Sequence, residues 1–325
     1  MMHRTFVTMI AVVVAACLFH VASADWLGLN FNPFFDFNRQ STALIKFYEE
    51  TQGATKWPNQ FRGGWASQTP CAWDGNERAH PAPWGTRCVT GGWHQPPPRG
   101  DGGLLFLEHY SGFAEGPVPR EFDAFQMTDV IGLGHNKLNG PIWDTQYHTF
   151  LHRLDLAHNQ MSGTLPDNFM KRNTIHCELV NLYDNQFTGS IPAIINTLKP
   201  LTAFLLGKNQ FSGTVPDISN LKRLRHLDLG DNQFSGTIGP WLKELDNLAW
   251  LFLQNNQFTG TLPELPPRVS RVLIGQNKWT GRIPESYGSL GYLRVFNCTG
   301  CQLECPTPNF LQHVYFSTHC KTPKW

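Results

Sequence analysis

Apolar and polar positions alternate in a short unit that recurs through the middle of the chain. In Leu224-x-x-Leu227-x-Leu229, polar residues separate the leucines. Alternation with a period of two predicts a short strand that sends its leucines into a core and its other side chains to solvent. An asparagine, an aromatic or apolar residue, a glycine and an apolar residue follow, usually with proline, as in Asn209–Pro216. Glycine permits a tight bend and proline stops further pairing, so this stretch predicts a turn.

One asparagine recurs in each unit, at steps of 23, 26, 24, 23, 24 and 21 residues. This period is typical of a solenoid in which successive coils stack and share one core. An asparagine that points inward satisfies buried backbone groups of the turn, which a leucine would leave unpaired. The asparagines predicted to have this structural role are Asn136, Asn159, Asn185, Asn209, Asn232, Asn256 and Asn277.

A degenerate copy of the unit stands at each end of the array. With these copies, the sequence predicts about nine coils over residues 104–297. The expected fold is an α/β solenoid, a right-handed curved superhelix with a parallel concave sheet. The degenerate copies are marked by Leu104, Leu107 and Gly116–Pro119 before the array, and by Leu290, Leu293 and Val295 after it.

The motif Asn-x-Phe-x-Gly-x-Ile-Pro, intact at Asn185–Pro192, resembles the plant-type leucine-rich repeat of polygalacturonase inhibitors and receptor ectodomains. The resemblance covers about Leu104–Cys298, and it implies a second strand in the glycine-containing stretch that follows each asparagine. The preceding region is similar to the amino-terminal cap of that family, with a helix around Ala43–Phe47 and then Trp65. Secreted and surface antigens of protists carry similar caps and repeats. The resemblance implies binding through the concave face, to a protein or a polysaccharide of a cell wall or host surface.

Cysteines cluster near both ends, which indicates disulfide-bonded caps at residues 25–103 and 298–325 in an oxidising compartment. The four carboxy-terminal cysteines allow three pairings, and the sequence does not choose among them. Cys298-x-x-Cys301 also fits zinc, although secretion favours a disulfide. Cys177 takes the first leucine position of its coil and is expected to be a buried thiol. The capping cysteines are Cys71, Cys88, Cys298, Cys301, Cys305 and Cys320.

Residues 1–24 have the features of a cleavable secretory signal, because Arg4 precedes an apolar run that ends near Ala22 and Ala24. No later segment reaches the length and apolar character of a membrane span. The mature chain is therefore expected to be secreted, or to associate with the cell surface without a transmembrane anchor. The phenylalanine-rich stretch Trp26–Phe37 is expected to cover the cap edge, with a partner-binding or membrane-surface arm as the alternative.

Composition excludes some functional classes. The formal net charge is +1 with both signs interspersed, whereas a nucleic-acid-binding protein normally carries a basic stripe. No Gly-x-Ser-x-Gly turn occurs, and Asp155 and Asp228 lie three coils apart, too far for a pair of glycosidase carboxylates. The sequence therefore predicts no catalytic residue and no cofactor. Asn297-Cys298-Thr299 is a glycosylation sequon near the carboxy-terminal cap.

His135, His158 and Asp184 occupy equivalent positions on neighbouring coils, just before the recurring asparagines. Two imidazoles and a carboxylate are able to hold zinc, and His158 with Asp184 is able to act as acid and base. Lys208 and Asp231 continue the column, however, as an ordinary ladder of mixed charge. An open sheet also neither excludes water nor closes a coordination sphere. We therefore expect no metal site here and keep an extracellular enzyme or metal-binding protein as the alternative function.

The solvent-facing positions of the last three coils differ from those of the middle coils, which present Asp155, Asn181, Asp228 and Asp231. Trp, Tyr and Arg are enriched in binding hot spots, and exposed apolar area needs a cover. A ligand is a better candidate for this cover than the carboxy-terminal cap, because a cap stacks along the solenoid axis and shields the final coil more than it shields Trp250. The sequence thus predicts a binding protein without enzyme activity. Its expected ligand-binding residues are Trp250, Phe252, Arg271, Leu273, Tyr292, Arg294 and Phe296.

Overall fold

The computed structural model describes residues 114–304 apart from 127 and 174, together with 43, 46, 50, 86–87, 106–108 and 315–318. The expected signal peptide and the Trp26–Phe37 stretch lie outside the described residues. So do four of the six capping cysteines, namely Cys71, Cys88, Cys305 and Cys320.

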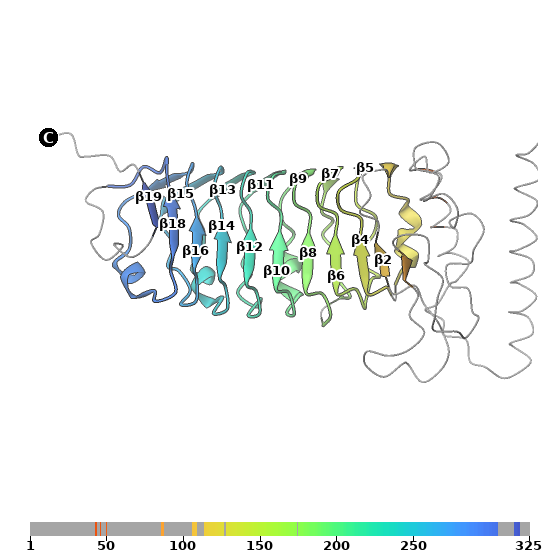
Figure 1. Cartoon of the computed structure of the whole chain (residues 1–325), viewed down its shortest axis with the longest axis horizontal. Helices are drawn as coiled ribbons and strands as arrows, with labels where there is room; N and C mark the ends of the chain where they lie inside the picture. The colour runs from red at the N-terminus through yellow and green to blue at the C-terminus, as the bar shows by residue number, and fades with distance from the viewer. Residues whose placement is uncertain are drawn as a thin grey trace, which may run out of the picture.

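The chain forms a solenoid whose coils each contribute one short strand to a main sheet (Figure 1). This sheet has 11 strands; β1 pairs antiparallel with β2, and the other neighbours pair parallel. We number nine coils by the strands β2, β4, β6, β8, β10, β12, β14, β16 and β18. The strands are β1 Thr86–Arg87, β2 Phe106–Glu108, β4 Val130–Gly132, β6 Arg153–Asp155, β8 Leu179–Asn181, β10 Ala203–Leu205, β12 His226–Asp228, β14 Trp250–Phe252, β16 Arg271–Leu273, β18 Val295–Cys298 and β19 Tyr315–Thr318.

A second sheet of eight strands runs along one edge of the main sheet, at the top of Figure 1. It consists mostly of the glycine-containing stretches in which the family resemblance implies a second strand. Short 3-10 helices connect several coils. Within the described repeats these are the helical elements, and no α-helix is present. The strands are β3 Glu115–Pro117, β5 Lys137–Gly140, β7 Gln160–Thr164, β9 Gln186–Gly189, β11 Gln210–Gly213, β13 Gln233–Gly236, β15 Gln257–Thr261 and β17 Lys278–Thr280, and the 3-10 helices are η2 Arg120–Ala124, η3 Ala193–Thr197, η4 Pro240–Glu244 and η5 Glu285–Ser289.

Glycine is required where the strands of the second sheet stack. Gly189 has a φ of +77°, and a Cβ atom there would lie 2.8 Å from Thr164 Cγ2 on the preceding coil. Any other residue at position 189 would therefore be strained, both by the left-handed backbone and by the close contact with Thr164.

Inward-pointing side chains of successive coils form one continuous core. Phe187, Phe211, Phe234, Phe258 and Trp279 stack along it with ring centroids 5.5 to 6.2 Å apart. Each coil thus buries its apolar face against its neighbours, and the coils depend on one another for stability.

The recurring asparagines form a ladder beside this core. Asn256 is typical: its Nδ2 donates to Leu229 O at 2.9 Å on the preceding coil and to Leu253 O at 3.2 Å on its own coil. Its Oδ1 accepts from Phe234 N at 2.9 Å. One side chain therefore joins the strand and turn of its own coil to two positions of the preceding coil.

The predicted register of the last coil was wrong by three residues. Leu293, Phe296 and Cys298, which are at most 2% exposed, fill the three inward positions, in place of Leu290, Leu293 and Val295. Their spacing matches Leu-x-x-Leu-x-Leu, with phenylalanine and cysteine as substitutes. Since neighbouring residues of a strand face opposite ways, this shift turns Phe296 from the solvent face into the core.

The described residues test two predictions about cysteines. Cys298 and Cys301 form a disulfide, which replaces the zinc alternative for this pair. Cys177 is a free, buried thiol as predicted, and its burial raises its pKa to about 12. Among the described residues, no helix has the length and apolar character needed to cross a membrane.

Candidate functional site

The solvent-facing, concave side of the main sheet carries an aromatic cluster on coils six to eight. The pairing of β12, β14 and β16 places His226, Trp250 and Arg271 side by side in one column. Asp228, Phe252 and Leu273 form the adjacent column in the same register. We call Trp250, Phe252, Arg271 and Leu273, together with His226, the concave patch.

Trp250 is held between its two neighbours along the solenoid. The imidazole of His226 lies parallel to the indole, with ring centroids 4.3 Å apart. On the following coil, the guanidinium carbon of Arg271 lies 5.6 Å from the ring centroid, within the range of a cation–π interaction. Phe252 is 6.3 Å away on the same strand. With a neighbour on either side along the axis, the indole presents mainly its edge to solvent, and 42% of the residue is exposed.

The seven residues predicted from sequence divide into three groups. Trp250 and Arg271 are exposed, while Phe252 and Leu273 are partly exposed on the same face. Tyr292 and Arg294 are exposed but precede β18, so they flank the concave patch at the edge of the sheet. Phe296 is fully buried and packs against Tyr287, with ring centroids 5.5 Å apart. Phe296 is therefore corrected from a ligand-binding residue to a core residue.

Two acidic residues of the middle coils are less solvated than the sequence suggested. Asp155 is only 7% exposed and accepts from Asn181 Nδ2 at 3.0 Å and from Arg153 at 3.3 Å. Asp228 lies beside the concave patch and accepts from Gly230 N at 3.0 Å. Its partial burial raises its pKa to about 6, mostly by desolvation of the carboxylate. Asp228 therefore changes charge just below neutral pH.

The column of His135, His158 and Asp184 lies in the turns that follow the strands, where the backbone has φ of 55° to 58°. His, Asp and Asn tolerate this left-handed conformation better than most residues, which accounts for their recurrence there. The rings of His135 and His158 stack at 4.3 Å, and His158 Nδ1 lies 2.7 Å from Asp184 Oδ2. Among the described residues, no group of three histidine, cysteine or carboxylate side chains is arranged to hold a metal ion. The column is thus accounted for by backbone geometry and side-chain pairing.

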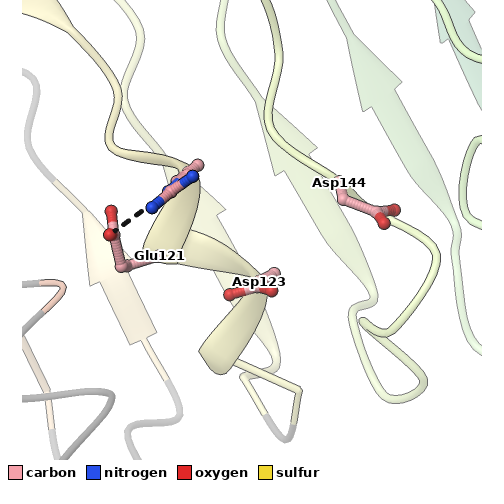
Figure 2. Close-up of a pocket in the computed structure, with 4 residues that line it drawn as sticks. Glu121, Asp123 and Asp144 are labelled. Carbon is pink, nitrogen blue, oxygen red and sulfur yellow. Dashed lines mark ion pairs between the residues drawn. The ribbon is translucent and has the colours of Figure 1, made fainter.

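A hollow of about 480 Å³ lies away from the main sheet, lined by Arg120, Glu121, Asp123 and Asp144 (Figure 2). Figure 2 shows that Glu121 pairs with the guanidinium of Arg120. Glu121 also pairs with Lys46, which lowers its pKa. Asp144 accepts from the backbone N–H and side chain of Gln146. Glu121 and Asp144 already have partners, and the described lining residues include no histidine, cysteine or serine to act with them.

Sequence reasoning missed His226 as a member of the concave patch. A lone histidine at a strand position carries no signal, because its neighbours Ala203 and Trp250 lie 23 and 24 residues away in sequence. An alignment of the coils by their asparagines would have found it, since it assigns His226, Trp250 and Arg271 the same position within the repeat.

Comparisons with known proteins agree with this architecture. The Leucine Rich Repeat family model matches residues 150–171, 223–245 and 247–269. Receptor-like protein 39 of Arabidopsis thaliana is 31% identical over 128 residues, which are 39% of this chain and 14% of that protein. The chain thus matches only a small part of this relative.

Solved receptor structures share the fold. A TDR receptor superposes with a TM-score of 0.61 at 27% identity, covering 67% of this chain and 39% of the receptor. The Arabidopsis receptor kinase HAESA, in complex with the peptide hormone IDA and the co-receptor SERK1, gives a TM-score of 0.57 at 27% identity over 63% of this chain and 36% of HAESA. The repeats, the asparagine ladder and these relatives make the chain similar to the plant-type leucine-rich-repeat proteins.

Proposed function

We propose that this chain is a secreted or cell-surface binding protein without enzyme activity, and that it captures an extracellular protein through the concave patch. The observation that carries the proposal is the exposure of Trp250 between His226 and Arg271, at the centre of the concave patch. Tryptophan and arginine are the residues most enriched in binding hot spots.

The stacking of Trp250 favours a protein over a polysaccharide as the partner. Aromatic residues that bind sugars offer a ring face to the apolar face of the sugar. Here His226 lies over one face of the indole and Arg271 lies near the other, so a sugar would have to displace a neighbour. A protein side chain is able to pack against the indole edge together with the partly exposed Phe252 and Leu273, and its carboxylates are able to pair with Arg271.

The relatives support a protein or peptide partner and an extracellular or cell-surface location. The structures of HAESA with IDA and SERK1, and of GASSHO1 with CASPARIAN STRIP INTEGRITY FACTOR 2, are complexes of receptor ectodomains with peptides or proteins. The similar curated proteins are receptor-like proteins. An extracellular or cell-surface location also agrees with the signal peptide that the sequence predicts and with the disulfide between Cys298 and Cys301.

The alternative is an extracellular enzyme or metal-binding protein that uses His135, His158 and Asp184. The structure gives this alternative one close pair, His158 with Asp184 at 2.7 Å, on an open surface. An acid–base pair is favoured by a pocket that excludes water, whereas the side chains of His158 and Asp184 are 38% and 47% exposed. The binding function therefore has the stronger support.

A selection of displayed random peptides against the purified protein tests the proposal. Peptides enriched on the wild type should bind Trp250→Ala at least about 30-fold more weakly, which corresponds to the hot-spot threshold of about 2 kcal/mol. Phe150→Ala is the matched control, because Phe150 is also 42% exposed but lies outside the concave patch. Binding to this control should equal binding to the wild type.

Two outcomes would contradict the proposal. Peptides that bind Trp250→Ala and the wild type equally would move the binding site away from the concave patch. Soluble cello-, xylo- or galacturono-oligosaccharides that bind the wild type and lose affinity with Trp250→Ala would make the partner a polysaccharide. Circular dichroism of each variant separates loss of binding from loss of folding.

A further inference from the structure

The asparagine ladder ends one coil before the solenoid does. In coil eight, Asn277 Nδ2 donates to Leu253 O at 2.8 Å on the preceding coil and to Ile274 O at 3.1 Å on its own coil. Coil nine has a cysteine, Cys301, where the next asparagine would stand, three residues after the inward-facing Cys298. The end of the ladder is therefore chemically different from every rung before it.

The disulfide between Cys298 and Cys301 joins the same two positions that asparagine joins in the other coils. In coil seven, for example, Asn256 Nδ2 donates to the carbonyl oxygen of Leu253, three residues before it. In coil nine a covalent bond connects the corresponding residues, whose Cα atoms are 5.5 Å apart. Both cysteines are buried, at 0% and 4% exposure, as the ladder asparagines are. The disulfide thus closes the turn of coil nine as an asparagine would.

The disulfide does not supply the hydrogen bond that an asparagine sends to the preceding coil. Cys301 Sγ lies 3.7 Å from Ile274 O, where the amide of the next asparagine would donate, but a disulfide sulfur has no proton to give. Trp279 provides this donor instead: its Nε1 donates to Ile274 O at 3.0 Å. Trp279 is fully buried at the position that phenylalanine holds in the four preceding coils. The carbonyl of Ile274 therefore keeps two donors, as Leu253 O has.

We propose that the Cys298–Cys301 disulfide and Trp279 together replace the terminal asparagine of the ladder, and that coil nine stays closed on coil eight only while this disulfide is oxidised. The inference is independent of which partner the concave patch binds. On reduction by a dithiol, the S–S bond breaks, each cysteine sulfur gains one electron and one proton, and the dithiol becomes a cyclic disulfide. Coil nine then loses the bond that replaces the asparagine, whereas coils two to eight keep their own asparagines.

Hydrogen exchange tests the inference at named amides. Ile274 N donates to Asn297 O at 2.8 Å and Gln276 N donates to Thr299 O at 2.7 Å, so both amides are protected by coil nine. Dithiothreitol should speed their exchange about tenfold or more. Leu206 N and Lys208 N, which donate to Asp228 O and Gly230 O between coils five and six, are the internal control and should exchange at an unchanged rate.

A double substitution removes the redox response without opening the coil. Cys298→Leu/Cys301→Asn restores the residues of a regular repeat, so the amides of Ile274 and Gln276 should stay protected with and without dithiothreitol. Continued acceleration by dithiothreitol in this variant would overturn the inference, because it would locate the response at other cysteines. Unchanged exchange in the reduced wild type would overturn it as well, and this measurement stands even if the double variant fails to fold.

The role of Trp279 is tested by combining variants. Trp279→Phe should lower the melting temperature of the wild type by several degrees, since Ile274 O loses one of its two donors. In the Cys298→Leu/Cys301→Asn background, the introduced amide supplies that donor, and Trp279→Phe should have a clearly smaller effect. Equal losses in both backgrounds would show that Trp279 contributes only packing.

Discussion

His226 on β12 lies parallel to Trp250 on β14, with ring centroids 4.3 Å apart and ring planes at 21°. Burial of the imidazole, and then the charge of the neighbouring Arg225, lower the pKa of His226. At neutral pH the imidazole is therefore uncharged, and the aromatic stack at the centre of the concave patch carries only the charge of Arg271. The protonation state of His226 is thereby linked to the exposed tryptophan.

Replacement of Trp250 should change the titration of His226. In Trp250→Ala, water reaches the imidazole, so the pKa of His226 should rise toward the ordinary histidine value of about 6.5. Two-dimensional NMR of the imidazole resonances measures this shift. Phe150→Ala should leave the titration unchanged. An identical His226 titration in Trp250→Ala and wild type would show that the indole does not shield the imidazole.

The asparagine ladder should dominate the stability of the middle coils. Asn209 donates to Leu182 O at 2.8 Å and Leu206 O at 3.1 Å, and it accepts from Phe187 N at 2.9 Å. Asn209→Leu leaves these buried groups unpaired, at a cost of about 1 to 3 kcal/mol each, so the free energy of unfolding should fall by several kcal/mol. Urea unfolding followed by circular dichroism measures the loss.

Gln210→Leu is the control for Asn209→Leu, because Gln210 is the next residue and its side chain is exposed on β11. This variant should change the free energy of unfolding by about 0.5 kcal/mol or less. Comparable losses in the two variants would mean that the ladder adds no more stability than a surface side chain does.

The repeat and its asparagines could be predicted from sequence because each coil encodes them locally. Leu224, Leu227 and Leu229 identify a strand without reference to any other coil, and the left-handed turns and glycines follow at fixed offsets. Where a coil departs from the consensus, the same reasoning failed. In the last coil, Phe296 and Cys298 take leucine positions, and a frame shifted by three residues, an odd number, reversed the predicted direction of Phe296.

The concave patch could be predicted only in part, because it depends on contacts between coils. Trp250 and Arg271 were found from their residue types, but His226 is recognised as their neighbour only when the coils are aligned with one another, as the register of β12 and β14 aligns them. The burial of Asp155 likewise depends on Asn181, 26 residues later in the chain. Partners on different coils leave no local pattern, and the sequence of a single coil does not report how deeply its polar side chains are covered.

Substitution of His158 should reveal no metal site. His158→Asn preserves a residue that tolerates the local φ of 55° but removes the imidazole that pairs with Asp184. We expect the purified wild type and the variant to contain equally little zinc by elemental analysis. One zinc ion per chain in the wild type, lost in His158→Asn, would restore the metal-binding alternative.

His148 should make the stability of the solenoid depend on pH. Its Nε2 accepts from Trp143 Nε1 at 2.7 Å and its Nδ1 lies 2.9 Å from Phe125 O, so the buried ring fits as a neutral imidazole. Burial lowers the pKa of His148 to about 4, below the ordinary value of 6.5 that applies in the unfolded chain. The folded state thus binds this proton less readily than the unfolded state does.

The sign of the pH effect follows from these two pKa values. Above pH 6.5 the contribution of His148 to stability is complete, because both states are neutral; as the pH falls from about 6.5 to 4, only the unfolded chain is protonated and the contribution is lost. The loss should approach about 3 kcal/mol. Urea unfolding at several pH values should give a shallower pH dependence for His148→Gln than for wild type, whatever the variant's overall stability. Trp143→Phe removes the donor to Nε2 and should narrow the range of pH over which stability falls. Parallel curves for the wild type and His148→Gln would show that His148 is not the group that titrates.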